Sequence, residues 1–405
     1  MKKILEYLLI ILIILDFPVV YSYFESFARL VTYSTLLILL LLVIPKYKYI
    51  TLTTYFITLI YYLGALLPFF TFNSKQDIAI FIQRYIFFLP LFFVYLRQNR
   101  KMNIGYNKSL LNKYVNVVFV IAIISLFMWF FCSIIGILSP TNYYPHTWKG
   151  YLEFIPSYYN IYFETQYSLL PGYSIARNTA FFNEGPMYNM ILSSALVSEL
   201  YLRKKSTIKV YIFIITILTT LTTTGFFVLL ILGAYKLFNQ KRRVSLSVKV
   251  LYATVSIIII TVGSIFLLNN KSKNEEGSLN TRTNTILVDI EVGMNNPILG
   301  SNFIKGEFKG KNSAQTDQSN SLFYLFACGG LYGIALYTIP LLYIPYIYYR
   351  KYKDSSWLFM MSVIFLVFIF TLSLHKYIIL MFVAWGISNL DLKRMSINNK
   401  HISVG

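Results

Sequence analysis

The 405-residue sequence has few groups that bind metals or support redox chemistry, with only two cysteines and three histidines. Cys132 and Cys328 both fall inside hydrophobic stretches, and no Cys/His spacing resembles a ligand set, which argues against a structural disulfide or a metal site. A glycine-rich phosphate loop of the nucleotide-binding kind is missing as well. We therefore expect neither a metal nor a cofactor.

Charge is also scarce, since 13% of the residues are charged and 57% are hydrophobic. This composition excludes an ordinary soluble protein, because apolar runs of about 18 or more residues recur from end to end. The pattern predicts an all-α polytopic membrane protein that forms one integral membrane domain over residues 1–405. About twelve spans are predicted, at residues 4–22, 29–45, 51–72, 78–96, 116–139, 186–202, 207–222, 225–239, 248–268, 321–349, 356–374 and 376–390.

The formal net charge of +20 raises the possibility of nucleic-acid binding, but the positions of the basic residues argue against it. Lys and Arg cluster at every second predicted membrane boundary, which is the pattern of the positive-inside rule. It predicts cytoplasmic N- and C-termini. The first hydrophobic segment lacks a small-residue cleavage site, so we expect a retained helix. The clusters are Lys2/Lys3, Lys46/Lys48, Arg97/Arg100/Lys101, Arg203/Lys204/Lys205, Lys241/Arg242/Arg243, Arg350/Lys351/Lys353 and Lys393/Arg394.

Two long polar segments interrupt the predicted spans, and the same charge pattern places both outside the membrane. The first polar segment (residues 140–185) is rich in tyrosine, and the second polar segment covers residues 269–320. Tyrosine and tryptophan anchor proteins at membrane interfaces, and they also stack on sugar rings. We expect two outer loops that contain short amphipathic helices.

Arg177 and Glu184 lie close together in the sequence RNTAFFNEGP of the first polar segment. Because proline suits the first turn of a helix, Pro186 predicts that Glu184 stands at a helix N-terminus, where backbone N–H groups favour an anion. One interpretation makes Glu184 a general base and Arg177 a phosphate ligand. The alternative is that Glu184 only caps the helix and Arg177 is solvated.

Arg282 stands in the second polar segment, before apolar residues spaced for one face of a helix. We predict a helix along the membrane surface that has Arg282 at its start and is broken at Asn296-Pro297. A cation is slightly unfavourable at a helix N-terminus, so Arg282 has another purpose. It binds either lipid head groups or the diphosphate of a lipid-linked substrate, which matches a guanidinium fork.

Three further features mark the ends and interiors of predicted spans. Asn320 or Ser319 is expected to cap the helix that begins at residue 321. Within that helix Gly329, Gly330 and Gly333 provide a smooth face for close packing. Asp16 and Arg84 are charges inside predicted spans, and both fall in the outer half, so we expect an ion pair that is either structural or in contact with substrate. His146 and His375 face outward without a partner recognisable in the sequence.

The order of these motifs resembles the Wzy-type polysaccharide polymerase and O-antigen ligase superfamily. The resemblance rests on RNTAFFNEGP, then NNPILGSN, then SNSLFYLFACGGLYGI, over roughly residues 177–335, and on the topology of the whole chain. It implies a GT-C-like helical membrane enzyme without a metal or cofactor. Such enzymes transfer glycans from a polyprenyl-diphosphate-linked donor to a lipid-linked acceptor on the outer face of the cytoplasmic (inner) membrane.

The resemblance also implies roles for individual residues. Arg177 and Arg282 match family arginines that bind the diphosphate, and Glu184 matches an acidic position of the polymerase branch. We expect these three as catalytic residues, and a substrate-binding set of Arg177, Arg282, Asn320, Tyr173, Asn178 and Arg84. Membrane lipids, a chain-length regulator and a flippase are expected partners, and nucleic acid is not.

Departures from the family keep alternatives open. Gln318 and Ser319 stand where the ligase branch has a histidine, which favours a polymerase over a ligase. A flippase for the same lipid-linked sugars predicts a charged central cavity and short external loops. A peptidoglycan glycosyltransferase of the shape-and-division type uses an outer-loop aspartate, for which Asp289 and Asp317 are available. An interaction scaffold is the remaining interpretation.

Overall fold

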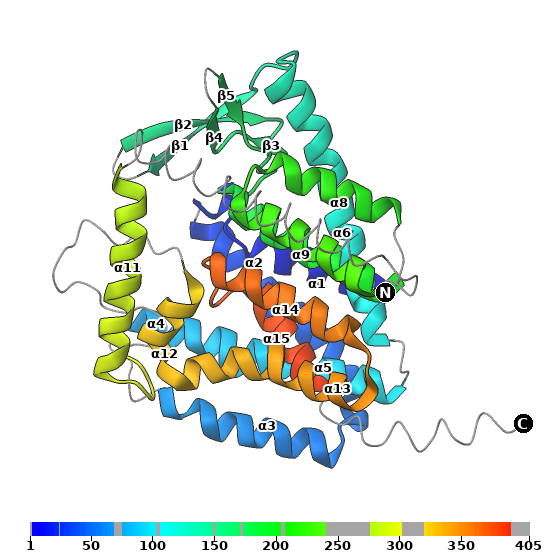
Figure 1. Cartoon of the computed structure of the whole chain (residues 1–405). Helices are drawn as coiled ribbons and strands as arrows, with labels where there is room; N and C mark the ends of the chain where they lie inside the picture. The colour runs from blue at the N-terminus through cyan, green and yellow to red at the C-terminus, as the bar shows by residue number, and fades with distance from the viewer. Residues whose placement is uncertain are drawn as a thin grey trace, which may run out of the picture.

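A computed structural model of the chain describes residues 2–23, 25–68, 75–102, 106–148, 151–170, 173–203, 207–239, 276–301 and 320–389. Most of these residues are helical (Figure 1). The α-helices are α1 (Lys2–Leu15), α2 (Glu25–Val43), α3 (Leu52–Ala65), α4 (Lys75–Phe81), α5 (Leu89–Met102), α6 (Tyr106–Met128), α7 (Gly185–Arg203), α8 (Ile208–Thr219), α9 (Thr223–Asn239), α11 (Glu276–Asn295), α12 (Ser321–Thr338), α13 (Ile344–Tyr352), α14 (Ser355–Phe370) and α15 (Tyr377–Ser388).

Short 3-10 and π segments extend several of these helices. The 3-10 segments are η1 (Val20–Tyr23) and η2 (Ile44–Tyr49), and the π segments are η4 (Ile82–Phe88), η5 (Trp129–Ile134) and η6 (Ile339–Tyr343). Within the described residues, four continuous helices are long and apolar enough to cross a membrane: Ser26–Tyr49, Ile78–Asn99, Lys108–Ile134 and Ser321–Tyr352.

The chain is therefore a predominantly helical membrane protein, while the number of spans and the cytoplasmic termini stay predictions. Shorter apolar helices occupy other predicted spans, including the α8–α9 hairpin. The first predicted span is shorter than expected, because α1 ends at Leu15. The predicted span 248–268 lies outside the described residues.

The core of the bundle is formed by α7, α14 and α15, whose apolar side chains are mostly buried. Helix α3 has the opposite character, with Leu52 72% and Ile60 67% exposed. Apolar side chains that are exposed in this way suit contact with lipid tails rather than water. In Figure 1 the long axes of α3, α5, α12, α14 and α15 run in a broadly similar direction.

The first polar segment folds into β-strands, so the prediction of an all-α chain with helical outer loops was wrong here. Strands β1 (Asn142–Trp148), β2 (Tyr151–Tyr158) and β3 (Tyr162–Phe163) form one antiparallel sheet, and β4 (Tyr167–Leu170) pairs with β5 (Tyr173–Ala176). The tyrosines and β-branched residues that the sequence concentrates here favour strands. The sheets lie at one edge of the helical bundle (Figure 1).

The second polar segment contains α11, which confirms the predicted helix and its end before Asn296-Pro297. The prediction that Arg282 starts this helix was wrong: the helix begins at Glu276, and Arg282 lies within it. Helix α11 packs on α12 and runs across its direction in Figure 1. Gly293 makes this packing possible, since a Cβ added there would lie 2.4 Å from the Phe326 ring.

Helix α12 is broken at Gly330, whose φ of 54° and ψ of −152° are accessible to glycine but not to other residues. The turn after α11 fills the break: a Cβ on Gly330 would lie 2.6 Å from backbone atoms of Pro297 and Ile298. The predicted smooth glycine face is thus used by an irregular backbone segment rather than by another helix.

Candidate functional site

Several connections meet at one end of the bundle, which we call the loop end. The turn after α1 lies against the segment before α7: the Val20 N–H donates to the Phe181 carbonyl at 3.0 Å, and the Asn183 N–H donates to the Pro18 carbonyl at 3.1 Å. The α8–α9 turn joins them through the Asn178 N–H, which donates to the Thr219 carbonyl at 3.0 Å. The charge pattern places the segment before α7 outside the membrane and the other two connections at the outer ends of predicted spans.

The opposite end of the bundle gathers basic residues that the same pattern places in the cytoplasm. Lys2 and Lys46 both donate to the Asn99 side chain, at 3.4 and 2.7 Å. Lys113 forms an ion pair with the buried Glu6 at 2.9 Å. These basic residues therefore lie at the end of the bundle away from the loop end, while the orientation of the bundle in a membrane stays a prediction.

The N-terminus of α7 brings Arg177 and Glu184 into one place. The Glu184 carbonyl accepts from the N–H groups of Met187 and Tyr188, so Glu184 stands at the helix N-cap position. The aliphatic part of Arg177 passes beside the first turn, since a Cβ on Gly185 would lie 3.7 Å from Arg177 Cδ. A guanidinium and the positive end of a helix dipole here share one region, which favours an anion.

Two hydrogen bonds to Gln166 fix the backbone of this region. The Gly185 N–H donates to Gln166 Oε1 at 3.1 Å, and the Arg177 N–H donates to the Gln166 carbonyl at 2.9 Å. A Cβ on Gly185 would also lie 3.1 Å from the Thr220 carbonyl oxygen, so only glycine fits without a shift. Gln166 therefore positions both Arg177 and the start of α7.

Asn178, the residue after Arg177, is fully buried. Its side-chain amide donates to Thr219 Oγ1 at 3.0 Å and to Ser125 Oγ at 3.4 Å, and its Oδ1 accepts from the Ala180 N–H. In this arrangement Asn178 fastens the segment before α7 to α6 and α8. Its expected contact with substrate stays a prediction.

Arg84 and Asp16 form the predicted ion pair, with Arg84 Nη2 2.5 Å from Asp16 Oδ1. Asp16 also binds the start of α15, because its Oδ2 accepts from the Tyr377 N–H at 2.9 Å and its carbonyl accepts from Lys376 Nζ at 3.0 Å. Arg84 Cζ lies 3.6 Å from the centroid of the Tyr377 ring. The pair thus ties α1, η4 and α15 together at the loop end.

His375 joins a chain of hydrogen bonds beside this pair. Tyr85 Oη lies 2.7 Å from both His375 Nδ1 and Tyr337 Oη, and Tyr337 donates to the Leu374 carbonyl. Since Tyr337 uses its proton on that carbonyl, Tyr85 must donate to Tyr337, and His375 Nδ1–H must donate to Tyr85. A neutral His375 therefore has its lone pair on Nε2.

Asn320 caps α12 as predicted, because its Oδ1 accepts from the N–H groups of Leu322 and Phe323 at 2.9 and 3.3 Å. The next residue, Ser321, donates to the Thr371 carbonyl at 2.5 Å and accepts from the Ser373 N–H at 3.1 Å. The start of α12 therefore lies beside the α14–α15 connection, two residues from His375.

The remaining predicted site residues are placed by their backbone. Arg282 lies in α11, and Tyr173 begins β5 opposite Leu170; the side chains of both lie outside the described part of the structure. Asp289 follows Arg282 by seven residues, on the same stripe of α11, and is 2% exposed. Burial raises the pKa of the Asp289 carboxyl to about 7.

Glu164 forms a second polar centre between the strands and the bundle. Its Oε1 accepts from Ser133 at 2.7 Å and from Tyr158 at 3.2 Å, and its Oε2 accepts from Tyr167 at 2.7 Å. Burial, followed by the nearby carboxylate, raises the pKa of the Tyr158 phenol. Together with the bond from Trp129 Nε1 to the Ala176 carbonyl, this centre fixes the sheets on α6 and η5.

Sequence reasoning did not single out Gln166, Glu164 or Lys376. Lys376 had a usable signal, because it is a basic residue at the outer boundary of a predicted span, where the positive-inside rule does not place one. Gln166 and Glu164 had none, since each acts through a contact that only the folded first polar segment creates. Among the described residues no group of three or more His, Cys, Asp or Glu side chains stands close enough together to hold a metal ion.

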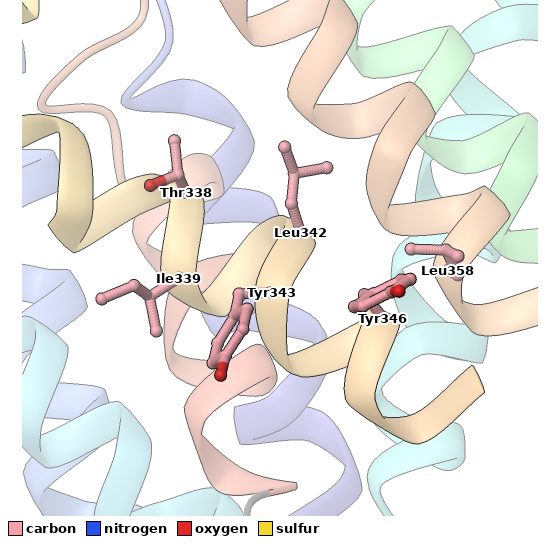
Figure 2. A pocket seen from close by; sticks show the side chains of 6 residues that line it. All are labelled: Thr338, Ile339, Leu342, Tyr343, Tyr346 and Leu358. Atoms are coloured by element: carbon pink, nitrogen blue, oxygen red, sulfur yellow. The ribbon is translucent and has the colours of Figure 1, made fainter. Parts of the chain in front are cut away.

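An apolar pocket of about 520 Å³ lies away from the loop-end residues. It is formed between the α12–η6–α13 helix and α14, where the Tyr346 ring lies beside Leu358 (Figure 2). Its open flank includes Ile339 and Tyr343, which are 46% and 58% exposed. Such a lining suits a lipid chain and offers little to a sugar phosphate.

No family model, curated protein or solved structure matches this chain.

Proposed function

We propose that this protein is a glycosyltransferase that polymerises polyprenyl-diphosphate-linked oligosaccharide repeat units into a surface polysaccharide, such as O-antigen or capsule. The proposal places its active site at the loop end, on the outer face of the cytoplasmic membrane. The single observation that carries it is the position of Arg177 beside the N-terminus of α7, where Glu184 stands at the cap.

The reaction follows from the charges at that helix end. An acceptor hydroxyl oxygen attacks the anomeric carbon of the donor glycan, and the bond from that carbon to the diphosphate oxygen breaks. Glu184 takes the hydroxyl proton, and the leaving polyprenyl diphosphate retains the bonding electrons. Arg177 and the positive end of the α7 helix dipole stabilise the developing negative charge without a metal.

The other expected residues extend this site. Arg282 on α11 grips the second phosphate of the donor, and Tyr173 stacks on a sugar ring. Asn178, which bonds the end of α8, and Asn320, which caps α12, are proposed as further substrate contacts. A flippase supplies the lipid-linked units, and a chain-length regulator limits the product.

A flippase for the same lipid-linked sugars is the second candidate, because Asp16, Arg84 and Lys376 place charges together inside the bundle. It predicts transport without chain growth. The folded strands of the first polar segment favour the polymerase, since a carrier has no need of a built external structure. An O-antigen ligase differs in its acceptor and would give the same requirement for Arg177.

The test replaces Arg177, Arg282 and Glu184 singly by Ala and measures the chain length of the surface glycan at equal protein level. We expect loss of long chains and accumulation of single repeat units on lipid outside the membrane. Arg29→Ala, an exposed arginine of α2, is the matched control and should keep full-length polymer. Normal polymer from all three variants would overturn the proposal, and units retained on the inner face would indicate the flippase.

A further inference from the structure

We propose that Arg84 and Lys376 form a phosphate-binding site at the loop end, which takes the phosphoryl group of a polyprenyl diphosphate or of an anionic phospholipid. The three charged groups come from different parts of the fold. Asp16 follows α1, Arg84 belongs to η4, and Lys376 directly precedes α15. Arg84 belongs to the expected substrate-binding set, but this site does not include Arg177, and its binding of a lipid phosphate does not require the polymerase reaction.

The group contains two cations and one carboxylate. Asp16 Oδ1 is 2.5 Å from Arg84 Nη2, whereas Lys376 Nζ donates to the neutral main-chain carbonyl of Asp16 at 3.0 Å. The second carboxylate oxygen, Oδ2, is occupied by the Tyr377 N–H at 2.9 Å. The group therefore carries a net charge of +1, and the side chains of Asp16 and Arg84 are only 5% and 11% exposed. Cations removed from water to this extent are stabilised by a further anion.

Within the described structure, Arg84 and Lys376 have N–H donors without an acceptor. Arg84 Nη1 is buried and has no hydrogen-bond partner among the described residues. An ammonium has three N–H donors, and the described contacts of Lys376 Nζ occupy one of them. Buried donors are normally satisfied, so Arg84 and Lys376 together present positions for two or more oxygens of one anion. A tetrahedral phosphoryl group offers that number.

The Arg84 side chain is held in a fixed position. The Arg84 guanidinium lies over the Tyr377 ring with Cζ 3.6 Å from the ring centroid, while Asp16 holds Nη2. A guanidinium fixed on both sides loses little entropy when it binds an oxyanion. The neighbouring titratable groups on the packed elements are Tyr85 and His375, which bond each other, and Tyr377, whose ring lies against the guanidinium.

The position of the site along the bundle suits a lipid phosphate. Asp16 and Lys376 stand where α1 has ended and α15 has not yet begun, so the site lies at helix ends rather than in the middle of the bundle. Lipid phosphates lie at that level of a bilayer, outside the hydrocarbon. A lipid phosphoryl group can therefore reach Arg84 while it stays in the headgroup region of the bilayer.

The test uses the purified full-length protein in nanodiscs and compares Arg84→Gln, Lys376→Gln and Asp16→Asn with wild type. One arm adds polyprenyl diphosphate to phosphatidylcholine nanodiscs, and the other replaces phosphatidylcholine by phosphatidylglycerol and counts retained lipids by native mass spectrometry. Arg29→Gln is the matched control, because Arg29 is an exposed arginine near the start of α2.

We expect Arg84→Gln and Lys376→Gln each to weaken binding about tenfold or more, as loss of a charge-assisted hydrogen bond predicts. Asp16→Asn raises the charge of the site from +1 to +2, and it should bind the probe several-fold more tightly. Whichever arm shows this pattern identifies the source of the phosphate.

A purely structural role for the three residues gives a different pattern. Asp16→Asn would then weaken binding as Arg84→Gln does, or no probe would bind wild type more tightly than Arg84→Gln; either result overturns the proposal. If Arg84→Gln fails to give folded protein, Lys376→Gln and Asp16→Asn decide the question through their opposite signs.

Discussion

The backbone N–H of Leu331 donates to the carbonyl of Pro297 at 2.8 Å, which joins the second polar segment to the break in α12. The Tyr332 N–H donates to the Ile298 carbonyl at 3.0 Å, and the Ala327 carbonyl accepts from the Ser301 N–H at 2.9 Å. In an unbroken helix residues 327 and 331 would bond each other. The turn after α11 thus satisfies backbone groups that the break exposes.

Gly330→Ala should destabilise the protein by about 3 kcal/mol, because a side chain meets the Pro297–Ile298 backbone at a conformation that glycine alone adopts. The thermal unfolding midpoint of the purified protein measures this loss. Gly64→Ala is the control, since an added Cβ in α3 meets only the Tyr332 hydroxyl at 3.8 Å. Equal midpoints for the two variants would contradict the account of the break.

Asp289 should make stability depend on pH between about 4 and 7. Burial raises the pKa of this carboxyl from 3.8 to about 7. As the pH rises, the unfolded chain therefore loses this proton at a lower pH than the folded protein does. Stability is then complete below pH 4 and falls as pH rises toward 7, by up to about 4 kcal/mol.

Asp289→Asn removes this pH dependence. The free energy of unfolding of the variant, relative to wild type, should therefore increase from about pH 4 to about pH 7 and then stay constant. Unfolding by denaturant at several pH values measures the difference. Glu291→Gln, which alters an exposed carboxyl of the same helix, is the control and should follow wild type. Parallel pH profiles for wild type and Asp289→Asn would refute the prediction.

Glu184→Gln separates a catalytic carboxylate from a helix cap. The Glu184 carbonyl that accepts from Met187 and Tyr188 is unchanged in this variant, so we expect stability within about 1 kcal/mol of wild type. Loss of the base should nevertheless abolish long glycan chains. The measurements are glycan chain length and the thermal midpoint, and a lowered midpoint with normal chains would assign Glu184 to the cap alone.

Glu6 and Lys113 form a buried ion pair at the other end of the bundle, 2.9 Å apart, with Tyr95 donating to the same carboxylate at 2.7 Å. Glu6→Gln should lower the free energy of unfolding by about 3–5 kcal/mol, because it leaves the Lys113 ammonium without its carboxylate. The double variant Glu6→Leu, Lys113→Met should recover most of that loss.

Lys2→Gln serves as the control for this pair, since Lys2 is 36% exposed and lies 3.8 Å from Glu6. Its effect should stay below about 1 kcal/mol. Denaturant unfolding of the four proteins compares their free energies of unfolding, and a double variant no more stable than Glu6→Gln would contradict a compensated pair.

The helices could be predicted because apolar runs are local in the sequence. One ion pair could be predicted because only two charged residues stood out within the predicted spans. Apolar runs mark most of the observed helices, and Asp16 and Arg84 were the intramembrane charges to be paired. The Asn320 cap was readable for the same reason, since it depends on its immediate neighbours.

The strands of the first polar segment and the bonds of Gln166 were not predicted, because they depend on contacts between distant parts of the chain. Glycines 329 and 330 suggested close packing in general, but not that the turn at Pro297 would enter the helix. The start of α11 was misplaced because the polar residues before Arg282 show no apolar periodicity.

The bonds of Asp16 have a consequence for how the protein is assembled during synthesis. Arg84 emerges from the ribosome early and can neutralise Asp16 after a few helices have been inserted. Lys376 and Tyr377 follow 360 and 361 residues after Asp16, so the first helix receives its last contacts only when the final helix arrives. A chain truncated before α15 therefore leaves the start of the bundle open, and quality-control proteases should recognise it there.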